Sequence, residues 1–213
     1  MLRLIEIDPD SRGTEPYLIQ LREWDTVLKN GGVVAFSTDT VWGVGARASD
    51  AQAVERLYEL KGRHDSQPLA CLVGNARIAR RFASSWPEPV DRLANLHWPG
   101  PLTLVVPTNG TPLPAVQRGV CRLGLRVPDR PVLLDLLMLL DEPLAATSAN
   151  RSGHPELSGV DQIRTAFGER LDLLVSDKLS VSGVASTVVE WNDGRLRILR
   201  QGSLGILLDS QDM

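Results

Sequence analysis

Short apolar segments that end abruptly in hydroxyl, amide or cationic residues alternate along this chain with amphipathic helical patterns. The first clear case, residues 32–36, runs directly into Ser37-Thr-Asp-Thr40. A later one, residues 144–146, runs into Thr147-Ser-Ala-Asn150. Buried strands of open α/β sheets deliver polar groups at their ends in this way, and ligands bind there. The alternation therefore predicts an α/β fold with a polar site at the strand ends.

Amphipathic periodicity and β-branched content place the individual elements. Helices are predicted at residues 16–29, 49–61, 76–82, 88–96, 131–140 and 160–167. Strands are predicted at residues 1–7, 33–37, 67–73, 102–107, 121–127, 144–146, 173–175, 187–191 and 196–200. The last two strands form a hairpin that turns at Asn192-Asp-Gly194. We therefore expect a twisted, mixed parallel and antiparallel open sheet with flanking helices.

Two local features follow the first buried strand. Gly43 and Gly45 are expected to open a loop in which the backbone approaches a neighbour closely. Ser49 and Gln52 are expected to cap the next helix reciprocally. Lys61 continues the apolar stripe of that helix. Its side chain either snorkels to solvent, complements the helix C-terminus or faces an anion in a cleft.

The composition fits one globular domain. A chain of 213 residues can bury a substantial core, and contents of 43% hydrophobic and 23% charged residues exclude disordered and fibrous classes. We expect a single domain over residues 1–213, with a motif-bearing core at about 16–202 and a short tail at 203–213. The net charge of −3 argues against a chain that is basic throughout, but it leaves room for a local basic groove for phosphates or RNA.

Several observations predict a cytoplasmic protein without a membrane partner. Cys71 and Cys121 are far apart and fit neither a disulfide framework nor a zinc site, which favours a reducing compartment. The longest apolar run, residues 132–140, is too short to cross a bilayer and contains Asp135. Residues 1–7 alternate like an edge strand and lack the layout of a signal peptide.

The common signatures of phosphate-binding loops, zinc proteases and serine hydrolases do not occur in the sequence, and no residue is predicted to bind a metal. The chain offers instead hydroxyl, amide and cationic donors suited to phosphate and carboxylate: Thr38, Thr40, Lys61, Arg63, Arg126, Ser148, Asn150, Ser186, Thr187 and Arg200. If they converge, they form a positively charged concave cavity, poor in carboxylates, that binds an anion. Each also has a structural explanation, as a cross-strand charge, a solvated arginine face, a turn cap or a strand start. The functional interpretation rests on their joint occurrence.

Seven short motifs occur in order between residues 31 and 202. They are Ser37-Thr-Asp-Thr-Val-Trp-Gly-Val-Gly45, Lys61-Gly-Arg63 with Gln67-Pro-Leu69, Trp98-Pro-Gly-Pro-Leu-Thr103, Leu125-Arg-Val-Pro128, Thr147-Ser-Ala-Asn150 with Ser152-Gly153, Ser186-Thr-Val188 and Ile198-Leu-Arg-Gln-Gly202. In these motifs the chain resembles the YrdC-like family of threonylcarbamoyl-AMP synthases, in its short single-domain form. One motif alone would be weak, whereas seven in register are specific.

The resemblance implies a twisted α/β sheet around a positively charged cavity. It also implies a reaction that joins L-threonine, bicarbonate or carbon dioxide, and ATP into threonylcarbamoyl-AMP and pyrophosphate. Partner proteins of the family then transfer the threonylcarbamoyl group to an adenosine next to the anticodon of tRNA. ATP is thus expected as a substrate, with Mg²⁺ on its phosphates held largely by substrate oxygens and water.

The resemblance also assigns roles by motif position. It implies that the catalytic residues around the phosphates are Lys61, Arg63, Ser148 and Asn150. The same motifs imply that the residues contacting ATP or the adenylate are Arg63, Gln67, Ser148, Asn150 and Arg200. Those implied for threonine or its carbamoyl group are Thr38, Thr40, Arg126, Ser186 and Thr187.

The sequence departs from the family pattern at three positions. Ser37 stands where the family usually has proline, Trp42 where it has tyrosine, and Leu72 where many members have histidine. The larger indole of Trp42 is expected to reshape the threonine end of the cavity. Two other functions remain open: a non-catalytic module of this fold that binds double-stranded RNA or tRNA, and a carbamoyl-transfer module like those of hydrogenase maturation enzymes.

Overall fold

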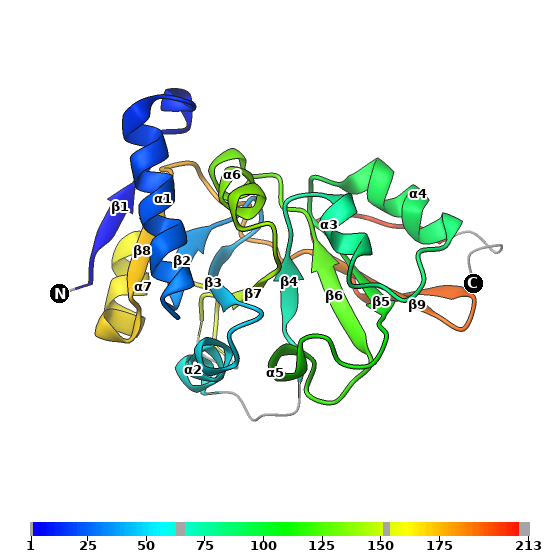
Figure 1. Ribbon diagram of the computed structural model, residues 1–213. Helices are drawn as coiled ribbons and strands as arrows, with labels where there is room; N and C mark the ends of the chain where they lie inside the picture. Colours follow the sequence, from blue (N-terminus) through cyan, green and yellow to red (C-terminus); the bar gives the residue numbers. More distant parts are fainter. Residues whose placement is uncertain (1, 63–66, 151–153, 209–213) are drawn as a thin grey trace.

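The computed structural model describes residues 2–62, 67–150 and 154–208 (Figure 1). The strands over these residues are β1 (Leu4–Glu6), β2 (Val34–Ser37), β3 (Trp42–Arg47), β4 (Ala70–Leu72), β5 (Leu102–Pro107), β6 (Arg122–Arg126), β7 (Leu144–Ser148), β8 (Leu173–Ser176), β9 (Thr187–Asn192) and β10 (Arg195–Arg200). They form one sheet in the order β1-β8-β2-β3-β7-β4-β6-β5-β9-β10.

The pairing of the strands is mixed, as predicted. β8 pairs in parallel with β1 and β2, β4 with β6, and β5 with β9, whereas the remaining neighbours are antiparallel. β1 forms one edge of the sheet and β10 the other. The predicted edge strand and the antiparallel closing hairpin are therefore confirmed.

The helices are α1 (Glu15–Lys29), α2 (Ala51–Lys61), α3 (Ala76–Arg80), α4 (Glu88–His97), α5 (Pro114–Gln117), α6 (Pro131–Leu140) and α7 (Val160–Phe167), with 3₁₀ turns at Pro9–Ser11 and Gly168–Arg170. Their ends follow local chemistry. Thr14 caps α1 by accepting a hydrogen bond from the Tyr17 amide, and Gly62 ends α2 in the left-handed conformation with φ of 59°. None of the helices in the described part of the chain is both long and apolar enough to cross a membrane.

Two local predictions after β2 are wrong. Residues 42–47 were expected in a loop but form β3, because β2 and β7 pair with them from either side and outweigh the poor strand propensity of their glycines. Ser49 does not cap α2: Asp50 accepts the hydrogen bond from the Ala53 amide at 3.0 Å, and the Ser49 hydroxyl donates to Glu142 Oε2. α5 was not predicted from the sequence.

Side-chain alternation divides the core in two. One hydrophobic cluster packs α2, α3, α4, α5 and α7 against the sheet, and it contains Cys71, Leu123 and Leu125. The other packs α1 and α6, which lie side by side in Figure 1, and it contains Phe36 and Leu72. Successive side chains of a strand point to opposite faces of the sheet. The strand residues that alternate with those of the first cluster therefore lie on the opposite face.

A row of small residues crosses the middle of the sheet. Gly45 of β3 is paired with Ala146 of β7, Ala146 with Ala70 of β4, and Ala70 with Gly124 of β6. Ala146, Ala70 and Gly124 all lie on the floor of the same cavity. Because these residues project little or no side chain, the row leaves a hollow in the sheet.

Candidate functional site

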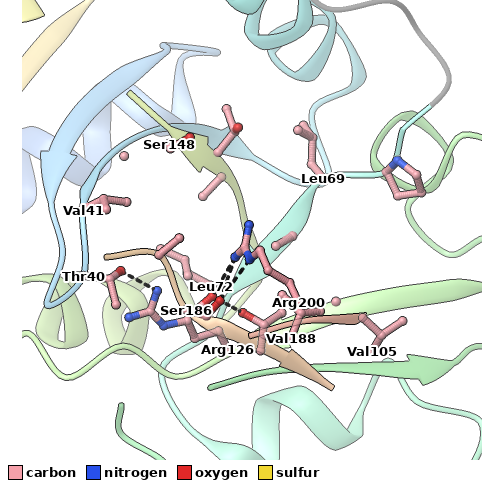
Figure 2. A pocket seen from close by; sticks show the side chains of 18 of the residues that line it. Thr40, Val41, Leu69, Leu72, Val105, Arg126, Ser148, Ser186, Val188 and Arg200 are labelled. Atoms are coloured by element: carbon pink, nitrogen blue, oxygen red, sulfur yellow. Dashed lines mark hydrogen bonds between the residues drawn. The ribbon is translucent and has the colours of Figure 1, made fainter. Parts of the chain in front are cut away.

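The hollow is part of a cavity of about 670 Å³, which has the size of a small-molecule site. Its floor comes from alternate residues of β4, β5, β6 and β9 and from the last three residues of β7, and its walls come from the ends of β2, α2 and β10. Most of the predicted site residues meet in this cavity: Thr38, Thr40, Lys61, Gln67, Arg126, Ser148, Asn150, Ser186 and Arg200. Figure 2 shows Ser148 apart from a group that contains Thr40, Arg126, Ser186 and Arg200, so the cavity has two ends.

Lys61, Ser148 and Asn150 form the first end. The Lys61 ammonium donates to the Ser148 carbonyl at 2.8 Å and to Asn150 Oδ1 at 2.5 Å. The Ser148 hydroxyl also donates to Asn150 Oδ1, at 2.8 Å. Lys61 is only 6% exposed, so it faces the cavity rather than snorkelling to solvent. Two oxygen acceptors and one hydroxyl thus orient a buried cation at the end of β7.

Thr38, Thr40 and Arg126 form part of the second end. Arg126 Nη1 donates to Thr40 Oγ1 at 2.8 Å, Nη2 to Asp39 Oδ1 at 2.6 Å, and Nε to the Gly100 carbonyl at 3.0 Å. Thr40 Oγ1 is also 3.0 Å from Thr38 Oγ1. Four separate contacts therefore fix the guanidinium and the Thr40 hydroxyl relative to each other.

Burial lowers the pKa of Arg126 below its ordinary value. The charge and hydrogen bond of Asp39 act in the opposite direction, and the nearby positive charge of Arg200 lowers the pKa of Arg126 further. An anion between Arg126 and Arg200 would relieve the repulsion between these two guanidinium groups. The electrostatics at this end favour a negatively charged ligand.

Ser186 and Arg200 complete the second end. Arg200 Nη2 donates to the Ser186 carbonyl at 2.9 Å and to its hydroxyl at 3.3 Å, and Ser186 Oγ lies 2.9 Å from Thr103 Oγ1. These contacts join β10 to the segment before β9 (Figure 2). Gly202 allows this close approach, because a Cβ atom there would lie 2.2 Å from the Ala185 carbonyl oxygen.

Two predictions about side-chain placement need correction. Thr187 does not line the cavity: its hydroxyl donates to the Leu204 carbonyl at 2.6 Å, because alternation in β9 turns it away from the side that Ser186 and Val188 face. Trp42 does not line the cavity either: its indole packs in the first hydrophobic cluster. Leu72 does line it. Arg63 lies outside the described residues.

The cavity is less poor in carboxylates than expected. Glu156 and Glu190 line it together with the cations Lys61, Arg122, Arg126 and Arg200. Glu190 accepts a hydrogen bond from Arg122 Nη1 at 2.5 Å, which compensates both charges. Glu156 is half-buried and has no hydrogen-bonding or ion-pair partner within the described ranges. No sequence signal indicated it, since it lies in an irregular segment after Asn150.

Thr103 was also missed. It is part of the quoted motif Trp98-Pro-Gly-Pro-Leu-Thr103, and alternation along β5 would have placed it opposite the apolar side chains of Leu102 and Leu104. The preceding Trp98–Pro99 peptide bond is cis. Within the described residues, no group of three or more histidine, cysteine, aspartate or glutamate side chains could hold a metal ion.

Comparison with known proteins matches the chain to one family. The family model Sua5/YciO/YrdC, described as telomere recombination, matches residues 26–202. A threonylcarbamoyl-AMP synthase of Pyrococcus abyssi is 34% identical over 177 residues, which cover 83% of this chain and 52% of that protein. One of Halorhodospira halophila is 35% identical over 167 residues, which cover 78% of this chain and 86% of the relative.

A solved structure agrees in fold. Sua5 of P. abyssi in complex with L-threonine superimposes with a TM-score of 0.82 at 31% identity, covering 96% of this chain and 57% of the other. The chain thus spans about half the length of its P. abyssi relatives. The twisted mixed sheet with flanking helices, predicted from the sequence, is confirmed. On sequence and structure together, the chain belongs to the Sua5/YciO/YrdC family.

Proposed function

We propose that the chain synthesises threonylcarbamoyl-AMP and pyrophosphate from L-threonine, bicarbonate or carbon dioxide, and ATP. One observation carries the proposal: a single cavity holds both the Lys61, Ser148 and Asn150 group and the Thr40, Arg126 and Ser186 group. Relatives named threonylcarbamoyl-AMP synthase support it. The two ends suit a nucleotide and a small amino acid placed side by side.

The proposed chemistry requires positioning more than covalent catalysis. The threonine amine adds to carbon dioxide and loses a proton, giving a carbamate. A carbamate oxygen then attacks the α-phosphorus of ATP, and the bond to the pyrophosphate oxygen breaks in line. Donors that orient the reactants and disperse negative charge accelerate such a step.

The donors at each end take separate roles in this proposal. At the first end, Lys61, with Ser148 and Asn150 beside it, stabilises the phosphates of ATP, and Gln67 contacts the adenylate. Arg200 contacts the adenylate from the second end, so the adenylate reaches both ends of the cavity. Arg126 and the hydroxyls of Thr40 and Ser186 hold the threonine carboxylate and its carbamoyl group. Thr38 acts indirectly, because its hydroxyl donates to the Val41 carbonyl at 2.6 Å and holds the loop that carries Thr40.

Mg²⁺ fits this cavity as an ion carried by the substrate. Mg²⁺ typically binds through one or two carboxylates together with phosphate oxygens and water, and Glu156 is a half-buried carboxylate in the cavity wall. We therefore assign Glu156 as the residue that would hold it. Bound there, the ion would neutralise charge on the phosphates. Glu190 is less suited, because it is already paired with Arg122.

The product would serve partner proteins that transfer the threonylcarbamoyl group to tRNA. This transfer completes the proposal that the chain acts in the modification of tRNA next to the anticodon.

Pyrophosphate release tests the proposed function. The purified protein should release pyrophosphate from ATP only when L-threonine and bicarbonate are both present, and mass spectrometry should detect threonylcarbamoyl-AMP. Release that persists without threonine would contradict the proposal. A chain that only binds RNA should show no saturable stabilisation by ATP, whereas a ligand at 100 times its Kd adds about 2.7 kcal/mol to the free energy of unfolding.

A further inference from the structure

Arg130 and Asp177 form an almost fully buried ion pair, with side chains 5% and 2% exposed. Arg130 Nε donates to Asp177 Oδ2 at 2.6 Å, and Nη2 donates to Oδ1 at 2.5 Å. Neither residue lines the cavity. A buried ion pair is often no more stabilising than well-packed apolar residues of similar size. The role of this pair is therefore inferred from the segments that it connects.

The ion pair anchors one end of residues 177–186, which we call the strap and which connects β8 to β9 (Figure 1). Arg130 Nη2 also donates to the Leu179 carbonyl at 2.7 Å, and Nη1 to the Ser180 carbonyl at 2.8 Å. The Ser37 hydroxyl donates to Asp177 Oδ1 at 2.9 Å. One guanidinium therefore holds the strap at three successive sites, and Ser37 ties this anchor to the end of β2.

The strap then runs along the loop that carries Thr40. The Gly183 amide donates to the Thr40 carbonyl at 2.8 Å, and the Ser182 hydroxyl donates to the same oxygen at 3.1 Å. The Ser182 amide donates to the Asp39 carbonyl at 3.3 Å. The strap ends at Ser186, which lines the cavity as Thr40 does. The strap, anchored by Arg130, thus contacts the backbone of Thr40 and itself contains Ser186, the two residues whose hydroxyls lie at the second end of the cavity.

We propose that Arg130 is a positioning residue for the amino-acid end of the cavity. It touches no ligand; through the strap it fixes Thr40 and Ser186 relative to each other. This role needs a guanidinium, because its fixed fork bonds the carboxylate and two backbone carbonyls at once, whereas a lysine ammonium has only three donors on one atom. The inference rests on the proposed function, which places threonine between these two hydroxyls.

The test compares Arg130→Lys with the wild type by isothermal titration calorimetry, with L-threonine and ATP titrated separately. The Kd for threonine should rise about tenfold, equivalent to about 1.4 kcal/mol, while the Kd for ATP should change less than about twofold. The matched control is Arg12→Lys, since Arg12 pairs with Asp135 away from the cavity. The control should leave both constants unchanged.

A double variant separates positioning from stability. Arg130→Met with Asp177→Leu replaces the pair by apolar side chains, which often preserves stability. It should keep ATP affinity and lose threonine affinity, with a midpoint of urea unfolding near that of the wild type. Unchanged threonine binding in either variant, or a parallel loss of both ligands, would overturn the inference.

Amide hydrogen exchange tests the inference on the wild-type protein, so its result does not depend on whether a variant folds. Saturating L-threonine should slow exchange of the Ser182 and Gly183 amides, and no slowing would also overturn the inference. Wild-type protein that binds ATP but not threonine would contradict the proposed function itself. Threonine binding with no response in the strap would contradict only the role of Arg130.

Discussion

At the scale of single residues, the cavity combines cations whose surroundings differ. Arg126 is compensated by Asp39 at 2.6 Å, and Arg122 by Glu190 at 2.5 Å. Arg200, in contrast, contacts the carbonyl and hydroxyl of Ser186 and has no carboxylate partner within the described part of the chain. Neutral hydrogen-bond partners do not compensate the positive charge of a cation, so this charge remains available to attract an anionic ligand. This difference supports the assignment of Arg200 to an anionic group of the adenylate.

Replacing Lys61 tests the phosphate end. Lys61→Met keeps the apolar stem and removes the charge, so kcat for pyrophosphate release should fall about 10²–10³-fold, as when one oxyanion donor is lost. The fold should persist, because Asn150 Oδ1 retains the hydrogen bond from the Ser148 hydroxyl. Circular dichroism checks the fold, and Lys29→Met is the control, since Lys29 pairs with Asp25 on α1. Wild-type turnover of Lys61→Met would remove this residue from the site.

Replacing Glu156 tests the assignment of Mg²⁺. A carboxylate repels free ATP unless a cation lies between them, so the wild type should bind ATP more tightly with Mg²⁺ than with EDTA. Glu156→Gln should reduce this ratio and should bind ATP in EDTA at least as tightly as the wild type does. Calorimetry measures both constants, with the exposed Glu88→Gln as control. An unchanged Mg²⁺ dependence would contradict the assignment.

At the scale of elements, regular patterns predicted most of the fold. The predicted bounds of the helices at Pro131–Leu140 and Val160–Phe167 match the structure, since a proline start or a clear apolar stripe marks them. β3 escaped prediction because its two glycines weaken the strand pattern and its pairing with β7 is non-local. In the site, the motifs indicated which residues are hydrogen-bond donors. Strand alternation is needed in addition to predict that Ser186 faces the cavity and Thr187 faces away from it. Glu156 lies in irregular structure, where no periodicity indicates direction.

The contact between the N-terminal region and α6 gives a prediction about pH. Partial burial raises the pKa of Asp135, but hydrogen bonds from Arg12 and Tyr17 and the charge of Arg12 outweigh it, so the pKa lies below its ordinary value. A lowered folded-state pKa stabilises the protein above the unfolded-state pKa of about 3.9, and this stability is lost as the pH falls through the folded-state value.

Asp135→Asn should therefore lower Tm at pH 7. The contact is partly exposed, so the effect should be about 1 kcal/mol or less, equivalent to roughly 2–4 °C for a chain of this size. The difference from the wild type should shrink as the pH approaches 3. Thermal unfolding followed across this range measures it. The control is Asp161→Asn, whose side chain is 96% exposed. A difference that grows toward low pH would contradict the explanation.

At the scale of the whole molecule, one sheet connects both hydrophobic clusters. The β2 strand contributes Ala35 to the first cluster and Phe36 to the second, so neither cluster can lose its packing without disturbing the other. This continuity supports the expectation of a single domain over residues 1–213, which remains a prediction.

Calorimetry tests the expectation of a single domain. Heat should unfold the chain in one transition, with equal calorimetric and van't Hoff enthalpies, since single cooperative domains behave in this way. ATP and threonine should shift the whole transition to higher temperature. Two transitions, only one of them shifted by ligand, would show that the clusters melt independently.

The row formed by Gly45, Ala146, Ala70 and Gly124 has an evolutionary consequence. Larger apolar side chains at Ala146, Ala70 or Gly124 would fill empty volume, and filling a void commonly raises stability. Selection of variants for heat resistance alone would therefore tend to obstruct the place where substrates are proposed to bind. The open centre of the sheet is therefore better explained by the proposed binding of substrates than by a contribution to stability.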